Sequence, residues 1–173
     1  MTRMEVLITR TREYLDYIER HYENVQEAWS NFRPELEGEY PKEFLAKLDD
    51  EIKEHDVSKL SDDEFIRYRD KFYPEDEEEN RRNGDSVQFN LAWKHHKESN
   101  NHHWQNWSSM LDGDEKRRAI IHNVIDWSAM GVEFGNNALD YYRENRNKIV
   151  IDSIDRLLLE KFLKLEAGEK EWV

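Results

Sequence analysis

Apolar positions in the first part of the chain follow the spacing of a helix. Between residue 6 and about residue 32 they are separated by three or four positions, which places them on one helical face. The members of this face are Tyr14, Ile18, His21, Val25 and Ala28. His21 therefore lies inside an otherwise apolar stripe.

Later segments carry helical spacing or helix-start signals. Pro34 and Gly38 are predicted to break the chain, and Pro41 to open a second helix. The helices predicted after the first span about 41–55, 61–73 with 61–64 as its start, 87–97, 115–134 and 154–165, with a segment at 141–142 before the last. Residues from about 74 to 86 are predicted to form an acidic loop after Pro74. The pattern thus predicts an all-α fold.

Composition agrees with helices and limits the chemistry. With 173 residues but only 6 glycines and 3 prolines, the chain fits one domain over residues 1–173 and lacks the turns of a β-sandwich or barrel. Cysteine is absent, which excludes disulfides and thiolate sites, so any metal must be held by nitrogen and oxygen. The N-terminal residues mix apolar and charged side chains, and we expect neither a secretory signal nor a membrane span.

Residues 54–59, EHDVSK, carry the most informative pair of side chains. His55 and Asp56 are predicted to lie at the end of a helix, where adjacent residues project about 100° apart and can reach one metal centre together. The imidazole would supply one nitrogen, and the carboxylate can bridge two ions. His-Asp pairs also arise by chance at solvated helix ends, so this pair needs support from elsewhere in the chain.

Four of the 7 histidines lie within residues 93–104, WKHHKESNNHHW. Imidazoles packed beside tryptophans repel one another when protonated and leave ring nitrogens unsatisfied when buried. A shared cation explains their density, and an exposed polar turn is the alternative. We select His96 and His103 as ligands, with His95 and His102 as their substitutes or as groups that orient them.

A carboxylate stands on the apolar helix predicted over 115–134. Asp126 lies between Ile125 and Trp127, where burial is costly unless a positive group meets it. A metal ion is one such group, and an Arg or Lys partner is the alternative. His122, one turn earlier, is assigned an orienting or surface role, and His21 alone is typical of a core histidine bonded to a carbonyl.

The candidate ligands, in chain order, are His21, His55, Asp56, His96, His103 and Asp126. This succession of H, HD, H, H and D resembles the HD superfamily of helical metalloenzymes, which are mostly phosphohydrolases. Lys59 matches the lysine of the HDxGK form, although Ser58 stands where glycine is usual. From His21 to about Ile151 the chain also resembles a little-characterised family of phage and bacterial proteins, through HDVSKLSDDEFIRYRDKFYP, FNLAWKHHKESNNHHWQNW and IDWSAMG.

The resemblance implies a single-domain, HD-like helical bundle with a central site for one or two divalent ions, of Mn, Zn, Mg, Co or Fe. The first ion would be held by His21, His55, Asp56 and Asp126, and the second by Asp56, His96 and His103. Asp56 and Lys59 would be the catalytic residues. Lys59, assisted by Arg67 or Lys94, would contact the phosphate.

The leading hypothesis is hydrolysis of a nucleotide or related phosphoester by a metal-activated water. A second hypothesis is a mixed-valence diiron oxygenase, which the same ligand set resembles, and a third is a non-catalytic acidic phage protein that binds or inhibits a host factor. The formal net charge of −13 opposes general duplex nucleic-acid binding but leaves room for a local phosphate pocket. We expect a cytoplasmic protein of a bacterium or phage-infected cell with no membrane partner. The sequence leaves open a homo-oligomer, the substrate and the metal.

Overall fold

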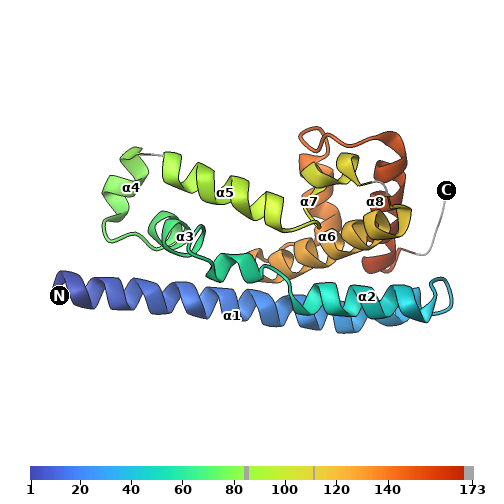
Figure 1. Ribbon diagram of the computed structural model, residues 1–173, viewed down its shortest axis with the longest axis horizontal. Coiled ribbons are helices and arrows are strands. Elements are labelled where there is room, and N and C mark those ends of the chain that lie inside the picture. The colour runs from blue at the N-terminus through green and yellow to red at the C-terminus, as the bar shows by residue number, and fades with distance from the viewer. Residues whose placement is uncertain (84–85, 111, 170–173) are drawn as a thin grey trace. The chain divides into compact units, whose positions relative to one another are not determined.

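Helices make up the regular structure of the chain, as the spacing predicts. The computed structural model describes residues 1–83, 86–110 and 112–169. Its helices (Figure 1) are α1 (Arg3–Leu36), α2 (Lys42–Lys53), the 3-10 helix η1 (Val57–Leu60), α3 (Phe65–Phe72), α4 (Glu77–Asn83), α5 (Val87–Ser99), the 3-10 helix η2 (Trp104–Ser109), α6 (Gly113–Phe134), α7 (Ala138–Asn145) and α8 (Ser153–Glu166). Among the described residues, β-pairing is limited to one isolated bridge, between Glu37 and Tyr40. The all-α class is therefore confirmed.

The first helix is longer than predicted. α1 continues through Pro34 and ends at Leu36, so the break predicted at Pro34 is wrong. Proline lacks the N–H that would bond to the carbonyl four residues earlier, but in the last turn this is the loss of a single bond. The N–H of Glu37 bonds to the Pro34 carbonyl at 3.2 Å, and Leu36 is fully buried. These contacts hold the last turn, and the chain reverses at Gly38, which has φ 91°.

Part of the predicted acidic loop is helical. Residues 77–83 of the expected 74–86 loop form α4, and residues 84 and 85 lie outside the described part of the chain. The Asp76 carboxylate accepts a hydrogen bond from the backbone N–H of Glu78 at 2.9 Å, which satisfies one of the free donors at a helix start. Acidic side chains at this end also interact favourably with the helix dipole. The loop prediction is therefore wrong for residues 77–83.

The His55-Asp56 pair lies in a turn and not on a helix. α2 ends at Lys53, and Asp56 has φ 54° and ψ 22°, the left-handed conformation. Aspartate tolerates this conformation better than bulky residues do. Asp56 leads into η1, where the N–H of Lys59 bonds to the Asp56 carbonyl at 2.9 Å. The helix predicted to run to His55 is wrong at its end, and a turn orients the two side chains.

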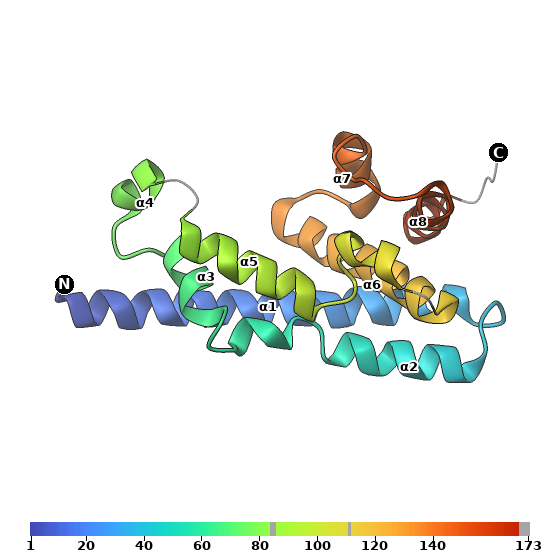
Figure 2. The same ribbon diagram turned by 45° about the horizontal axis from the view of Figure 1, so that its top comes forward.

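The packing of the backbone divides the chain into two units, residues 1–22 with 56–100, and residues 23–55 with 101–173. In the first unit, α3 packs against α5, and η1 contacts both (Figures 1 and 2). The core of this unit is built on Tyr14, Tyr68 and Ala92. The partly buried residues that pack against it are Tyr17, Ile18, Phe65, Tyr73, Phe89 and Trp93. The first unit therefore has a mainly aromatic core.

The second unit is organised around α6. This helix contacts α2, η2, α7 and α8, and residues 118–127 are all buried. A helix that is covered on every side belongs to the core. α1 contributes Val25 and Trp29 to that core, and α2 contributes Leu48 and Ile52. The position of α6 accounts for the burial of the polar residues that it carries.

Within the described residues, none of the helices has the length and apolar character needed to cross a membrane. The single domain that the length favours over residues 1–173 stays a prediction.

Candidate metal centres

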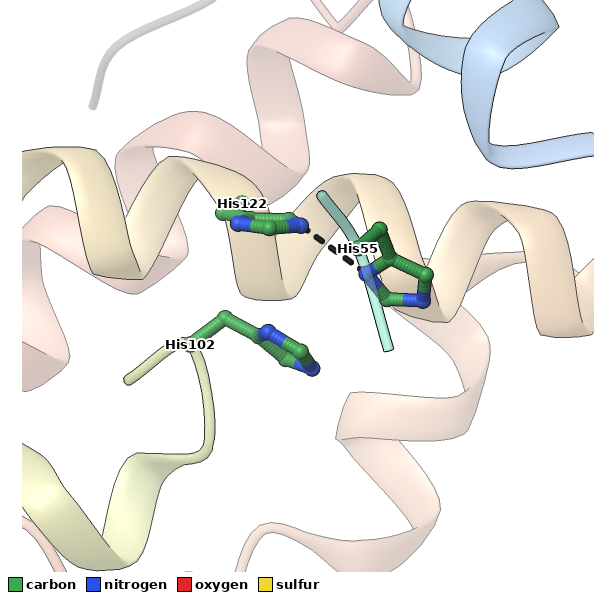
Figure 3. A group of neighbouring side chains, drawn as sticks. All are labelled: His55, His102 and His122. Atoms are coloured by element: carbon green, nitrogen blue, oxygen red, sulfur yellow. Dashed lines mark hydrogen bonds between the residues drawn. The ribbon is translucent and has the colours of Figure 1, made fainter. Parts of the chain in front are cut away.

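The second unit gathers three buried histidines from separate segments. His55 follows α2, His102 precedes η2, and His122 lies in the middle of α6. Their exposed fractions are 5%, 3% and 6%, and one ring nitrogen from each lies within 4.8 Å of those of the other two. Figure 3 shows the three rings gathered beside α6. Buried nitrogen donors this close together could hold a metal ion.

Asp126 adds a carboxylate to this group from the next turn of α6. Its Oδ1 lies 3.6 Å from Nε2 of His55, and its Oδ2 lies 3.9 Å from Nε2 of His102. Both distances are too long for hydrogen bonds. Two ligands of one tetrahedral ion are separated by about 3.3 Å when each bond is about 2.0–2.1 Å. Small movements would therefore bring Asp126 and either histidine to ligand spacing.

His122 contacts His55 in a different way. Nε2 of His122 and Nδ1 of His55 are 2.9 Å apart, a hydrogen-bond distance (Figure 3). In a neutral imidazole one nitrogen donates and the other carries the lone pair. When Nδ1 of His55 donates to His122, Nε2 of His55 carries the lone pair and lies nearest Asp126. Groups outside a metal site commonly orient a ligating histidine in this way.

The first unit contains a second group of buried histidine and aspartate side chains. The Asp56 carboxylate lies 3.5 Å from Nε2 of His96 and 3.9 Å from Nε2 of His21. The Lys59 ammonium contacts Oδ2 of Asp56 at 2.8 Å, and Lys59 is only 7% exposed. A buried ammonium requires an anionic partner. Asp56 therefore joins two potential metal ligands to a buried positive charge.

Glu64 orients one of these histidines. Its fully buried carboxylate accepts hydrogen bonds from Nδ1 of His95 at 2.7 Å and Nδ1 of His96 at 2.9 Å. Burial by itself would raise the pKa of Glu64, but hydrogen bonds led by those from His96 and His95 outweigh it and hold the pKa below its usual value. An ionised carboxylate only accepts, so Nδ1 of His96 carries a proton, and in a neutral ring Nε2 would direct a lone pair toward Asp56.

Ser58 belongs to the same network. Its hydroxyl accepts a hydrogen bond from the Asn100 side chain at 2.8 Å, and its own hydrogen bond helps to lower the pKa of Glu64. Asn100 also donates to the backbone carbonyl of His96 at 2.7 Å. Glycine, which the HDxGK form has at this position, could make none of the side-chain contacts. Ser58, which replaces that glycine, thus has a local structural role.

Within the first unit, the predicted ligands His21, Asp56 and His96 lie together. Within the second unit, the predicted ligand His55 lies beside Asp126. The prediction of a single centre for all of them draws on residues of both units and stays a prediction.

The two adjacent pairs, His95 with His96 and His102 with His103, differ in the surroundings of their side chains. Nε2 of His96 lies beside Asp56, whereas the side chain of His95 is 37% exposed. His102, ranked below His103 in the sequence analysis, is the one that lies with His55 and His122. The ring centroid of His103 is 4.4 Å from that of His102. Within the second unit, His102 is thus a candidate ligand beside His55, and the assignment of His103 as a ligand stays a prediction.

The other candidate cations have surface partners. Arg67 donates to the Gln88 side chain at 3.0 Å and to the Asp63 backbone carbonyl, and Lys94 is 3.7 Å from Glu98 with a 70% exposed side chain. Of the three residues predicted to contact phosphate, Lys59 is the one that forms an ion pair with Asp56.

The role of Glu64 does not follow from the sequence alone. Glu64 lies in the segment predicted to start a helix, where acidic side chains are usually solvated. The histidines that Glu64 contacts follow it by 31 and 32 positions, so no local spacing indicated the pairing.

These features define an all-helical protein with buried histidine and aspartate groups that could hold metal ions. The chain belongs to a family of unknown function, DUF5662, whose profile matches residues 10–165. No curated protein and no solved structure matches it.

Proposed function

We propose that this protein is a metal-dependent phosphohydrolase that acts on a nucleotide or a related phosphoester. The observation that supports the proposal most is the group formed by His21, Asp56, His96 and Lys59. It combines nitrogen and oxygen donors for an ion with a buried ammonium that can contact an anionic substrate. The order of the candidate ligands along the chain resembles that of the HD superfamily, and this resemblance suggests the reaction class, phosphoester hydrolysis.

In the first unit, His21, Asp56 and His96 would hold one ion. Their donors suit Mn, Zn, Co or Fe, and Mg through the carboxylate. Glu64 keeps His96 in the tautomer that a ligand needs, because its carboxylate accepts the Nδ1 proton at 2.9 Å.

In the second unit, His55, His102 and Asp126 would hold an ion, and His122 would orient His55. The 2.9 Å contact from Nδ1 of His55 to His122 supports this division of roles, because that nitrogen is engaged in a hydrogen bond. The other nitrogen of His55 is the one that lies 3.6 Å from Asp126.

When bound, a divalent ion in such a site acts as a Lewis acid and lowers the pKa of a water molecule. Lys59 would contact a phosphoryl oxygen as a point charge. Its pairing with Asp56 at 2.8 Å keeps the ammonium in place before the substrate arrives.

The test begins with metal analysis of protein prepared without an affinity tag. Metal-free protein is then supplied with single ions, and phosphate release is followed across nucleoside mono-, di- and triphosphates. We expect release that depends on Mn, Zn, Co or Mg and that Asp56→Asn abolishes, while the exposed surface variant Lys148→Ala keeps it. Absence of phosphate release with every ion and nucleotide would contradict the hydrolase proposal.

Two outcomes would favour the other candidates. Two irons per chain with oxygen-dependent turnover would indicate the diiron oxygenase, which uses the same donor types. The net charge of −13 fits the third candidate, a non-catalytic binding protein. Such a protein should keep its partner in a folded Asp56→Ala variant, whereas an enzyme should lose its activity.

A further inference from the structure

Two buried tyrosine hydroxyls in the first unit lack a hydrogen-bond partner among the described residues. They belong to Tyr14 on α1 and Tyr68 on α3, which are 1% and 6% exposed. The rings are held in the aromatic core: that of Tyr14 lies 5.3 Å from Phe65, and that of Tyr68 lies 5.7 Å from His96, between centroids. The packing fixes both rings while their polar ends remain unsatisfied.

An unsatisfied buried hydroxyl is unfavourable, and phenylalanine would fill nearly the same space without that cost. Two such hydroxyls in one core therefore point to a ligand that accepts their hydrogen bonds. The Tyr14 ring stacks on that of Tyr17 at 6.5 Å between centroids, and the Lys59 ammonium lies 5.7 Å from the centroid of that same Tyr17 ring. The hydroxyls thus share a neighbourhood with the candidate metal group.

Both hydroxyls are donors. A tyrosine hydroxyl has an ordinary pKa of about 10, so it carries its proton at neutral pH and can donate one hydrogen bond.

The charge of this neighbourhood depends on the metal. The carboxylates of Asp56 and Glu64 outweigh the ammonium of Lys59 by one negative charge, with the histidines neutral. A divalent ion on His21, Asp56 and His96 changes the balance to one positive charge. The metal-loaded unit would therefore attract an anion that the metal-free unit repels.

We propose that the hydroxyls of Tyr14 and Tyr68 donate hydrogen bonds to phosphoryl oxygens that are held beside Lys59 in the metal-loaded protein. The inference rests on the proposed function for the metal, and it assigns the tyrosines to recognition of the anionic group of the substrate. Tyr14 and Tyr68 are binding residues in this proposal and take no proton from the substrate.

Inorganic phosphate is the probe, and its binding to Mn-loaded and metal-free protein is measured by titration calorimetry. The variants are Tyr14→Phe, Tyr68→Phe and, as a matched control from the second unit, Tyr40→Phe. A hydrogen bond to a charged group is worth enough to change affinity by about 10- to 100-fold. We expect that loss in each of the first two variants, no change in the control, and no phosphate binding without metal.

Two companion measurements keep the outcomes distinct. The affinity for Mn should be unchanged in Tyr14→Phe and Tyr68→Phe, and their melting temperatures should be equal to or above that of the parent, because only an unsatisfied hydroxyl is removed. Phosphate affinities equal to the parent in both variants would overturn the inference and assign the hydroxyls to buried water. Mn binding without phosphate binding would also overturn it and leave the metal site standing, whereas absence of Mn binding would overturn the proposed function itself.

Discussion

Replacing Glu64 by glutamine tests how the first unit prepares a histidine for metal. The carboxylate is fully buried and accepts from His95 at 2.7 Å and from His96 at 2.9 Å. Glutamine offers one acceptor and one donor, so one histidine must either face another donor or move its proton to Nε2. For His96 that shift would direct an N–H, in place of a lone pair, toward Asp56.

The magnitudes follow from these contacts. Loss of one hydrogen bond to a buried charge lowers the free energy of unfolding by about 1.5–3 kcal/mol, which corresponds to a fall in melting temperature of about 3–12 °C for a chain of this size. Loss of a group that orients a ligand lowers metal affinity by about 10- to 100-fold. We therefore expect Glu64→Gln to melt earlier and to bind Mn or Zn more weakly.

The assay is thermal unfolding of metal-free protein, followed by metal titration at a temperature where each variant is folded. Glu98→Gln is the matched control, because the Glu98 side chain is 65% exposed on the same helix as His96. Glu64→Gln with the parent's metal affinity would refute the orienting role, whatever its melting temperature.

Three further predictions concern the second unit. His102→Ala should lose metal binding there, whereas His122→Ala should weaken it by only about 10- to 100-fold; equal losses in a metal titration would make His122 a ligand. Burial alone would raise the pKa of Asp49, but hydrogen bonds led by that from Arg33 hold the pKa below its usual value. The stabilisation it gives should therefore be present above about pH 4 and be lost as the pH falls through the lowered pKa, so acid unfolding of Asp49→Asn should lack part of the parent's pH dependence. Gly131→Ala should lower the free energy of unfolding by about 1–3 kcal/mol in denaturant titrations, because the added Cβ would lie 2.6 Å from a backbone carbonyl oxygen; a variant as stable as the parent would show that this backbone can yield.

Helix positions could be predicted largely from spacing and caps. Ser86, whose hydroxyl accepts from the N–H of Phe89, and Asp112, which accepts from Asp114, mark helix starts that a reader of the sequence can find. The errors arose where tertiary contacts decide. The burial of Leu36 stabilises the last turn of α1 beyond Pro34. Residues 77–83, which were expected to form a loop, are a helix whose start is capped by Asp76.

The candidate site was predictable in its residue types and less so in its members. A rotation of one helical residue, about 100°, separates His95 from His96, and only the packing of α5 in the first unit decides between them. The left-handed turn at Asp56 has no signature in the dipeptide. The burial of Glu64 depends on partners more than thirty positions later, which no local pattern records.

The most direct test of the metal proposal is anomalous X-ray diffraction from crystals of the untagged protein grown with Mn or Zn. The account predicts anomalous peaks within about 2.0–2.3 Å of Nε2 of His96 and the Asp56 carboxylate, and of Nε2 of His55 and the Asp126 carboxylate. Well-ordered crystals with no peak at either group, under ion concentrations that occupy surface sites, would contradict it.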